Sequence, residues 1–363
     1  MPRPQSLRGA TRLATDAVTG VTDLVEAMHA QIMRRPLTAS RQRTTGITGL
    51  VYRSVRGVTQ LVGGGLDLAL GALAPLLGQA GAEDASAVQA ALNGVLGDYL
   101  EATANPLATT MSLRPLVEGA TGTPLVLLHG LCMNEAQWRR DGSDFPAALA
   151  ALGYQPLGLR YNTGRAIWRN GADLAALLDG VPGPLTLLGH SMGGLVARSA
   201  IAQAGGRRWT KRLQRLVTLG TPHLGAPLER GGQQVQQLLA VSAYSRPLAG
   251  LAARRSAGIR DLRHASLLEA DEGVASRIPL PAGVACYAVA ATTAKKPSGP
   301  PARWLGDGLV PVASALGQHR EAARRLAFTD TAVFTGLGHL ALQTDAAVLR
   351  QLQAWLARPS SPA

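Results

Sequence analysis

Residues 185–194 read Leu-Thr-Leu-Leu-Gly-His-Ser-Met-Gly-Gly. A short apolar run, 185–188, leads directly into Gly189-His190-Ser191-Met192-Gly193, the single Gly-x-Ser-x-Gly pattern of the chain, and a helical pattern covers 195–204. A serine on a sharp strand-to-helix turn needs flanking glycines, because side chains there would clash with the turn. The stretch therefore predicts that Ser191 is a nucleophile exposed at the carboxyl end of a strand.

Strand and helix patterns alternate on both sides of this stretch. Apolar runs typical of strands cover 125–128, 155–160, 216–219, 284–291 and 332–334, and helical patterns cover 173–178 and 346–356. Such alternation is typical of the α/β class. It predicts a mostly parallel sheet with helices on both faces.

Two segments depart from this alternation. Residues 1–110 carry apolar side chains at helical spacing, including one stripe from Val88 to Leu100, and predict a helical N-terminal extension before a catalytic domain at 111–358. Residues 227–281 are polar and helical, and an insertion there would lie above the carboxyl ends of the strands, where open α/β sheets bind ligands. A lid or cap is one interpretation of 227–281, and a purely structural helical excursion is the other.

A serine nucleophile needs a base, and four histidines follow Ser191. His339 stands in a loop between the expected strand 332–334 and the last helix, which favours it as the base. His264 and His319 lie in Arg-rich stretches that we expect to be helical and solvated. His223 follows the strand 216–219 and is expected in a loop near the site.

The acid that orients the base is expected between the serine and the histidine in the chain. Asp307 lies between Gly306 and Gly308, after the strand 284–291, and the glycines allow its carboxylate to turn inward. Asp330 is the alternative, although its place before the last strand is more typical of a cap or turn. Asp307 would hold the tautomer of the imidazole and stabilise the imidazolium.

The oxyanion of an acyl-transfer reaction needs two backbone N–H donors. One is expected from Met192, the residue after the nucleophile. The other is expected from the loop after the first core strand, His129-Gly130-Leu131, with Leu131 as the candidate.

These motifs together resemble the bacterial lipase and esterase branch of the α/β-hydrolase superfamily, related to GPI-inositol-deacylase-like proteins. The matching pieces are His-Gly-Leu at 129–131, Gly-His-Ser-Met-Gly-Gly at 189–194, Thr-Pro-His-Leu-Gly at 221–225, Gly-Asp-Gly-Leu-Val-Pro at 306–311 and Gly-Leu-Gly-His-Leu at 336–340. The resemblance implies the α/β-hydrolase fold and a triad of Ser191, Asp307 and His339. It covers residues 111–358 and leaves residues 1–110 without a counterpart.

Composition bounds the partners. The 363 residues carry a formal net charge of +13, yet the basic residues are scattered, which is typical of an Arg-rich proteome more than of a nucleic-acid surface. Nucleic-acid motifs, nucleotide fingerprints and metal-spaced His/Cys sets are missing, so we expect no nucleic acid, no cofactor and no metal. The N-terminal extension has two interpretations: its apolar stripes pack on the hydrolase core as structural support, or, because the first 60 residues are clearly basic, it makes a peripheral contact with an anionic lipid or granule surface. The lack of Trp and Phe in this region favours packing.

Two cysteines, Cys132 and Cys286, are too few for a disulfide framework and are expected to be small buried side chains in a reducing compartment. Acidic residues interrupt the N-terminal stretch where a signal peptide would be apolar, and the run 61–78 is too broken to span a bilayer. The sequence thus predicts a cytoplasmic protein and leaves open a peripheral location at a lipid or granule surface.

Three functions are compatible with this pattern. The first is a carboxylic-ester hydrolase acting on lipid-like or polyester acyl esters through an acyl-enzyme. The second keeps the acyl-enzyme and changes the acceptor or the bond, as in a thioesterase or acyltransferase. The third is a membrane- or granule-associated binding protein whose hydrolase core is not catalytic.

Overall fold

The computed structural model describes residues 82–225, 256–271, 276–295 and 306–359. The chain divides into two compact units, one of Met1–Ala85 with Leu100–Ala108 and one of Ser86–Tyr99 with Thr109–Ala363. Most of the first unit lies outside the described residues. The second unit holds the sheet and every site residue predicted above.

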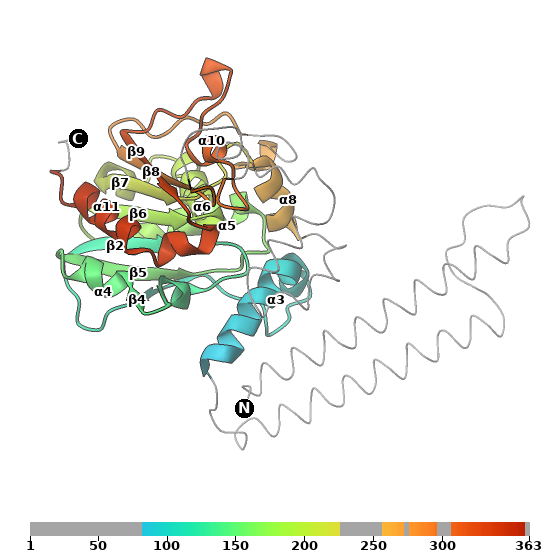
Figure 1. Cartoon of the computed structure of the whole chain (residues 1–363). Coiled ribbons are helices and arrows are strands. Elements are labelled where there is room, and N and C mark those ends of the chain that lie inside the picture. The colour runs from blue at the N-terminus through green and yellow to red at the C-terminus, as the bar shows by residue number, and fades with distance from the viewer. Residues whose placement is uncertain (1–81, 226–255, 272–275, 296–305, 360–363) are drawn as a thin grey trace, which may run out of the picture. The chain divides into compact units, whose positions relative to one another are not determined.

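A seven-stranded sheet forms the centre of the second unit (Figure 1). Its order is β1-β5-β2-β6-β7-β8-β9, and β1 is antiparallel to β5 while the other neighbours pair in parallel. The strands are β1 Ser112–Pro115, β2 Thr123–Leu128, β5 Tyr154–Arg160, β6 Leu185–His190, β7 Leu213–Leu219, β8 Ala285–Thr292 and β9 Asp330–Thr335, with a separate hairpin of β3 Arg139–Arg140 and β4 Ser143–Asp144.

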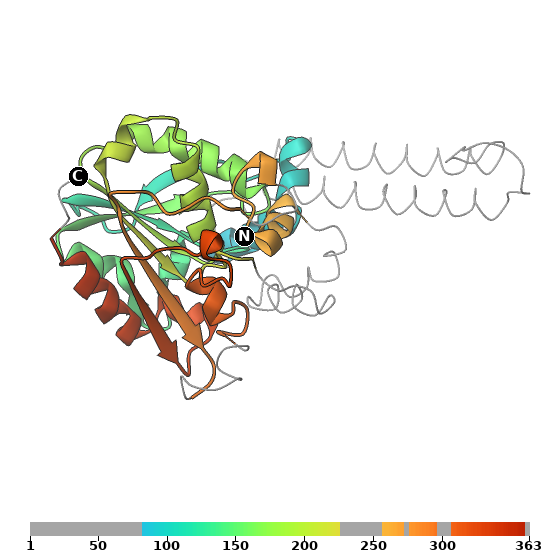
Figure 2. The same cartoon turned by 90° about the horizontal axis from the view of Figure 1, so that it is seen from above.

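Helices cover both faces of this sheet. On one side α5, Ile167–Leu177, packs against α6, Met192–Ala202. On the other side, side chains of α4, Phe145–Ala150, and α11, Ala346–Leu356, join strand residues in one core cluster that contains Phe145, Leu127, Val217 and Trp355. Figure 2 shows α11, in red, and α6, in yellow-green, on opposite sides of the sheet. The fold is the α/β-hydrolase fold, as the sequence predicted.

The remaining described elements are short apart from two helices. These two are α3, Ala82–Ala102, and α8, Ala257–His264. The shorter ones are η1 Glu135–Trp138, η2 Leu178–Gly180, η3 Arg208–Arg212, η5 Glu269–Asp271, α10 Val312–Ala315, η6 Ala322–Arg324 and η7 His339–Gln343.

The sheet order places a ligand site. The chain runs from β2 outward to β5, and then returns past β2 to β6 and on toward β9. The winding direction therefore reverses between β2 and β6, and ligands bind at the carboxyl ends of strands at such a point. The loop after β2 begins at His129, and the turn after β6 holds Ser191.

Most of the predicted strands are confirmed, with ends that differ by a few residues. The predicted helix 173–178 is longer, because α5 begins at Ile167. The predictions missed β1 and the β3–β4 hairpin, whose few residues carry no apolar run.

The N-terminal extension and the insertion are only partly described. The stripe from Val88 to Leu100 forms part of α3, while the earlier stripes lie outside the described residues. Residues 226–255 of the insertion also lie outside them, and its far end contains α8 and η5. The domain boundary at residue 110 and the lid stay predictions.

Candidate active site

Ser191 sits on a strained turn between β6 and α6. Its φ is 54° and its ψ is −124°, a conformation that L residues rarely adopt. Its backbone N–H donates to the carbonyl of Leu219 on the neighbouring strand, at 2.8 Å, which holds the turn against the sheet. Strain of this kind persists only where the surroundings enforce it, and it is concentrated at functional sites.

The glycines around Ser191 are required by close backbone packing. A Cβ at Gly189 would lie 2.5 Å from the nitrogen of Gly194, and one at Gly193 would lie 2.4 Å from the carbonyl oxygen of Leu128. A Cβ at Gly194 would lie 2.1 Å from Oγ1 of Thr221. The turn therefore fits against β2 and the end of β7 only without these side chains.

Asp307 and His339 form a buried pair. Nδ1 of His339 donates to Oδ2 of Asp307 at 2.7 Å, and the two residues are only 5% and 3% exposed. Oδ1 of Asp307 accepts from the backbone N–H groups of Leu309, at 3.0 Å, and Val310, at 2.8 Å. Both carboxylate oxygens thus have donors, and in a neutral ring a proton on Nδ1 places the lone pair on Nε2.

Within the described part of the chain, Nε2 of His339 has no hydrogen-bond partner. A buried ring nitrogen without a hydrogen-bond partner lowers the stability of the fold, and a catalytic role is one reason why native proteins keep such a group. The structure brings Asp307 and His339 together, and it places Ser191 on the neighbouring elbow. It records no hydrogen bond between His339 and Ser191.

Gly220 makes room for the pair and was not singled out from the sequence. It follows β7 with a φ of +55°, and a Cβ there would lie 3.0 Å from Oδ2 of Asp307, 3.2 Å from Cε1 of His339 and 2.7 Å from Cδ1 of Leu342. The signal was available as a glycine between a predicted strand and Thr221-Pro222, but its meaning depends on what packs there.

His190 is hydrogen-bonded to the loop that carries His339, here called the histidine loop. Its Nε2 donates to the backbone carbonyl of His339 at 3.0 Å, and the two ring centroids are 4.7 Å apart. Burial, together with the neighbouring His339, holds the pKa of His190 well below its usual range. His190 is therefore neutral and links the elbow to the histidine loop. The sequence identified it only as a member of the Gly-x-Ser-x-Gly motif.

The loop after β2 lies directly against the elbow. A Cβ at Gly130 would lie 3.2 Å from Cβ of Ser191 and 3.3 Å from Nδ1 of His190. The hydroxyl of Tyr161 donates to the carbonyl of His129 at 2.6 Å, and the rings of these residues stack at 4.5 Å. Gly130, the residue before Leu131, thus lies next to Ser191, and His129 lies next to the amino end of α6, where Met192 is located.

Burial also keeps His129 neutral. It lowers the pKa of His129 from 6.5 to about 4. The ring donates from Nδ1 to the carbonyl of Gly130 at 3.0 Å. A neutral ring lets the loop pack without a buried charge.

His223 is buried and belongs to another network. Its Nδ1 accepts from Nη1 of Arg198 at 3.3 Å, and its Nε2 contacts Oγ1 of Thr218 at 3.2 Å. Burial, reinforced by the charge of Arg198, holds the pKa of His223 well below its usual range. Nη2 of Arg198 donates to the carbonyl of Ile278 at 2.5 Å, so this network ties α6 to the segment before β8.

The other candidates lie elsewhere. Asp330 begins β9, at the opposite end of the strand from the site, and accepts from Nε1 of Trp355 and Nη2 of Arg358, each at 3.0 Å. His264 ends α8, but the prediction of helical surroundings was wrong for His319, which follows the turn after α10. Both histidines are half-buried instead of fully solvated. The flanking Pro311 and Gly317 limit the helix near His319 to one turn.

Cys132 and Cys286 are free and buried, as predicted. Among the described residues, no cluster of three or more His, Cys, Asp or Glu side chains could hold a metal ion. The helices in the described ranges include none with the length and hydropathy that crossing a membrane requires.

The sheet order, the elbow and the loop arrangement define an α/β-hydrolase fold. Within it, residues 178–276 match a family model described as a PGAP1-like alpha/beta domain. This segment contains β6, the elbow and β7. No match to a curated protein was found.

Several solved structures are weakly similar. The mature lipase BlEst2 of Bacillus licheniformis is 20% identical with a TM-score of 0.46, over 68% of this chain and 98% of that one. An esterase of Thermogutta terrifontis is 16% identical with a TM-score of 0.41, over 70% and 95%. A soluble variant of the monoglyceride lipase of Saccharomyces cerevisiae is 11% identical with a TM-score of 0.42, over 70% and 92%.

Proposed function

We propose that the chain is a serine hydrolase that cleaves carboxylic esters, with lipid-like or polyester acyl esters as its substrate class. The observation that carries this proposal is the buried Asp307–His339 pair, in which Nε2 of His339 has no hydrogen-bond partner among the described residues, beside a strained serine elbow. A general base needs a lone pair next to the nucleophile, and the serine needs an exposed turn.

The proposed reaction has two halves. Oγ of Ser191 attacks the ester carbonyl while Nε2 of His339 takes its proton, and Asp307 stabilises the imidazolium. The N–H groups of Leu131 and Met192 donate to the oxyanion. His339 then gives its proton to the leaving alcohol, and water attacks the acyl-enzyme by the same route in reverse, which releases the acid and restores Ser191.

A thioesterase or an acyltransferase would use the same acyl-enzyme. The site residues are the same in each case, so the choice rests on the leaving group and the acceptor. We favour ester hydrolysis because the motifs of the chain resemble those of lipases and esterases. Peripheral contact with a lipid or granule surface and a cytoplasmic location stay predictions. The basic residues on which the surface contact would depend lie outside the described residues.

Two measurements test this proposal. A fluorophosphonate probe should label the full-length protein at Ser191 and leave Ser191→Ala unlabelled. Hydrolysis of p-nitrophenyl esters of graded chain length, compared with matched acyl thioesters and with alcohol acceptors, should favour esters and water. A wild-type protein that is folded, unlabelled and inactive on every ester would support the non-catalytic binding protein instead.

A further inference from the structure

Helix α3 precedes the sheet in the chain, and its residues Ser86–Tyr99 cluster with the unit that holds the site. Two glycines, Gly94 and Gly97, lie inside this helix. Glycine is the poorest helix former after proline, so two of them in one helix require a packing reason. That reason is close contact with the loops at the carboxyl edge of the sheet.

Gly94 lies against the residue that follows Leu131. A Cβ at Gly94 would be 2.1 Å from Sγ of Cys132 and 2.9 Å from its Cα. Cys132 has a φ of 60°, in the left-handed region, so its backbone is held in an unfavourable conformation. Its Sγ lies 3.9 Å from the carbonyl of Ala91, and its N–H donates to Oγ1 of Thr163 at 3.1 Å.

The same helix also contacts the loop after β5. Nδ2 of Asn162 donates to the carbonyl of Gly97 at 2.9 Å, and a Cβ at Gly97 would lie 1.9 Å from Oδ1 of Asn162. In addition, Oγ of Ser256 donates to the carbonyl of Gly94 at 2.8 Å. Helix α3 thus contacts three segments: the loop after β2, the loop after β5 and the residue before α8.

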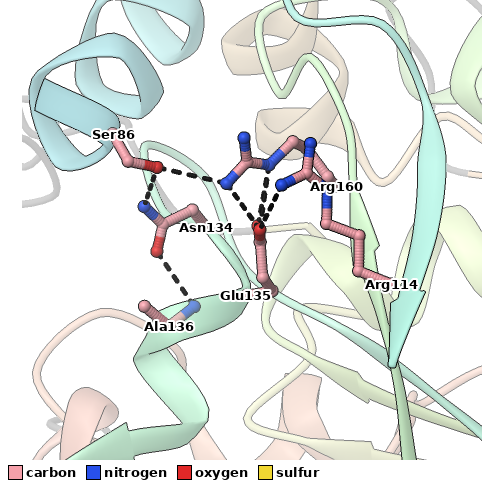
Figure 3. A network of polar contacts seen from close by, with 6 residues as sticks. All are labelled: Ser86, Arg114, Asn134, Glu135, Ala136 and Arg160. Atoms are coloured by element: carbon pink, nitrogen blue, oxygen red, sulfur yellow. Dashed lines mark hydrogen bonds and ion pairs between the residues drawn. The ribbon is translucent and has the colours of Figure 1, made fainter. Parts of the chain in front are cut away.

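A polar network joins Ser86, near the start of α3, to Asn134 and Arg160 (Figure 3). Oγ of Ser86 accepts from Nδ2 of Asn134 at 3.1 Å and from Nη2 of Arg160 at 3.2 Å. Nε of Arg160 donates to Glu135 at 2.9 Å, and Arg114 contributes a longer contact with Glu135 at 4.0 Å. The residues joined to Ser86 therefore include the end of the loop that starts at His129.

We propose that helix α3 positions the oxyanion loop, with Gly94 and Ser86 as the positioning residues that seat Cys132 and Asn134, the residues that directly follow the proposed donor Leu131. The inference rests on the proposed function, because Leu131 acts as an oxyanion donor only in that reaction. Oxyanion donors must lie within about 2.7–3.1 Å of the developing charge. A small displacement of Cys132 moves the preceding N–H of Leu131 and so weakens the stabilisation of the transition state, while substrate binding stays intact.

The test compares variants of the full-length protein. Gly94→Ala should lower kcat for a p-nitrophenyl ester by about tenfold to a hundredfold, as misplacement of a catalytic group by 1 Å does, with KM within about twofold of wild type. Affinity for an alkyl trifluoromethyl ketone, whose adduct with serine carries the oxyanion, should fall by the same factor. Gly180→Ala is the matched control, because a Cβ at Gly180 has nothing within 4 Å.

Ser86→Ala is the gentler variant if Gly94→Ala does not fold. It should lower kcat and inhibitor affinity by about threefold, the loss of one modest hydrogen-bond contribution. Its control is Arg114→Ala, which removes a side chain that is 52% exposed and does not contact Ser86. Folding is checked by circular dichroism and thermal unfolding.

The outcomes separate the inference from the proposed function. If wild type is labelled at Ser191 while folded Gly94→Ala and Ser86→Ala keep the wild-type kcat and inhibitor affinity, the positioning role is overturned and the hydrolase remains. If wild type is not labelled at Ser191, the positioning role and the proposed hydrolase function are both overturned. Equal losses in the variants and their controls would also overturn the positioning role.

Discussion

The two sides of the proposed site are built in different ways. The elbow side, 185–194, is contiguous in the chain, and its glycines enforce the conformation of Ser191 through contacts of the turn with itself and with β2 and β7. The assembled side, made of Asp307, His339 and the oxyanion loop, joins segments far apart in the chain. Local geometry is thus readable from a short motif, whereas the assembled side depends on packing.

The largest effect is expected when any one member of the proposed triad is removed, whichever side of the site it belongs to. Ser191→Ala, His339→Ala and Asp307→Ala should each lower kcat for ester hydrolysis by about 10⁴-fold or more, and double variants should add little, because the three act as one unit. Steady-state kinetics of single and double variants measure this.

Asp330→Ala is the matched control for the acid, since Asp330 binds Trp355 and Arg358 away from the site. Its kcat should stay near wild type. If Asp330→Ala is as damaging as Asp307→Ala, the assignment of the acid is wrong.

Acid should destabilise the folded protein through its buried neutral histidines. The pKa of His129 is lowered from 6.5 to about 4, so between these values the unfolded chain binds more protons than the folded one, and the free energy of unfolding falls as pH falls. A shift of this size corresponds to about 3 kcal/mol once the pH is below the folded pKa. The lowered pKa values of His190 and His223 act in the same direction.

Urea unfolding between pH 7.5 and 4 measures this loss. His129→Asn keeps a donor near the position of Nδ1 and removes the titrating group, so its stability should depend less steeply on pH over the same range. An unchanged slope in His129→Asn would exclude His129 as a source of the acid sensitivity.

Gly220 tests whether space beside the Asp–His pair matters. Gly220→Ala would bring a methyl group to 3.0 Å from Oδ2 of Asp307 and should lower kcat/KM by about tenfold through displacement of the pair. Gly336→Ala has a similar positive φ, +72°, with nothing within 4 Å of the added Cβ, so it carries the backbone cost alone. A loss of activity in Gly220→Ala alone would support the role of this space beside the Asp–His pair. Equal kinetics in the two folded variants would contradict that role.

The smallest expected effect concerns the link between the two sides. His190→Leu removes the donor to the carbonyl of His339 and should lower kcat/KM by about fivefold, because a buried acceptor loses its partner. His190→Gln keeps an N–H near the position of Nε2 and should recover most of that loss. If both substitutions behave alike, the hydrogen bond is not what joins the elbow to the histidine loop.

Much of the fold follows from local patterns in the chain. The strands β2, β6, β7 and β8 are buried on both faces, so they read as continuous apolar runs and were predicted within a few residues. The edge strand β1, Ser112–Pro115, is half exposed and carries no such run. The predicted boundary of α5 is too late because its first turn holds the polar residues Arg169 and Asn170, which break the apolar pattern.

The elbow and the order of the proposed catalytic residues follow from the sequence alone, because a turn with this conformation constrains its own and adjacent residues. Which glycines and histidines matter around them depends on how distant segments pack together. Gly94 meets Cys132, Gly220 meets Asp307, and His190 meets the carbonyl of His339. Parallel strands bring together loops that are tens to hundreds of residues apart, and no spacing in the chain encodes which atoms then come within contact distance.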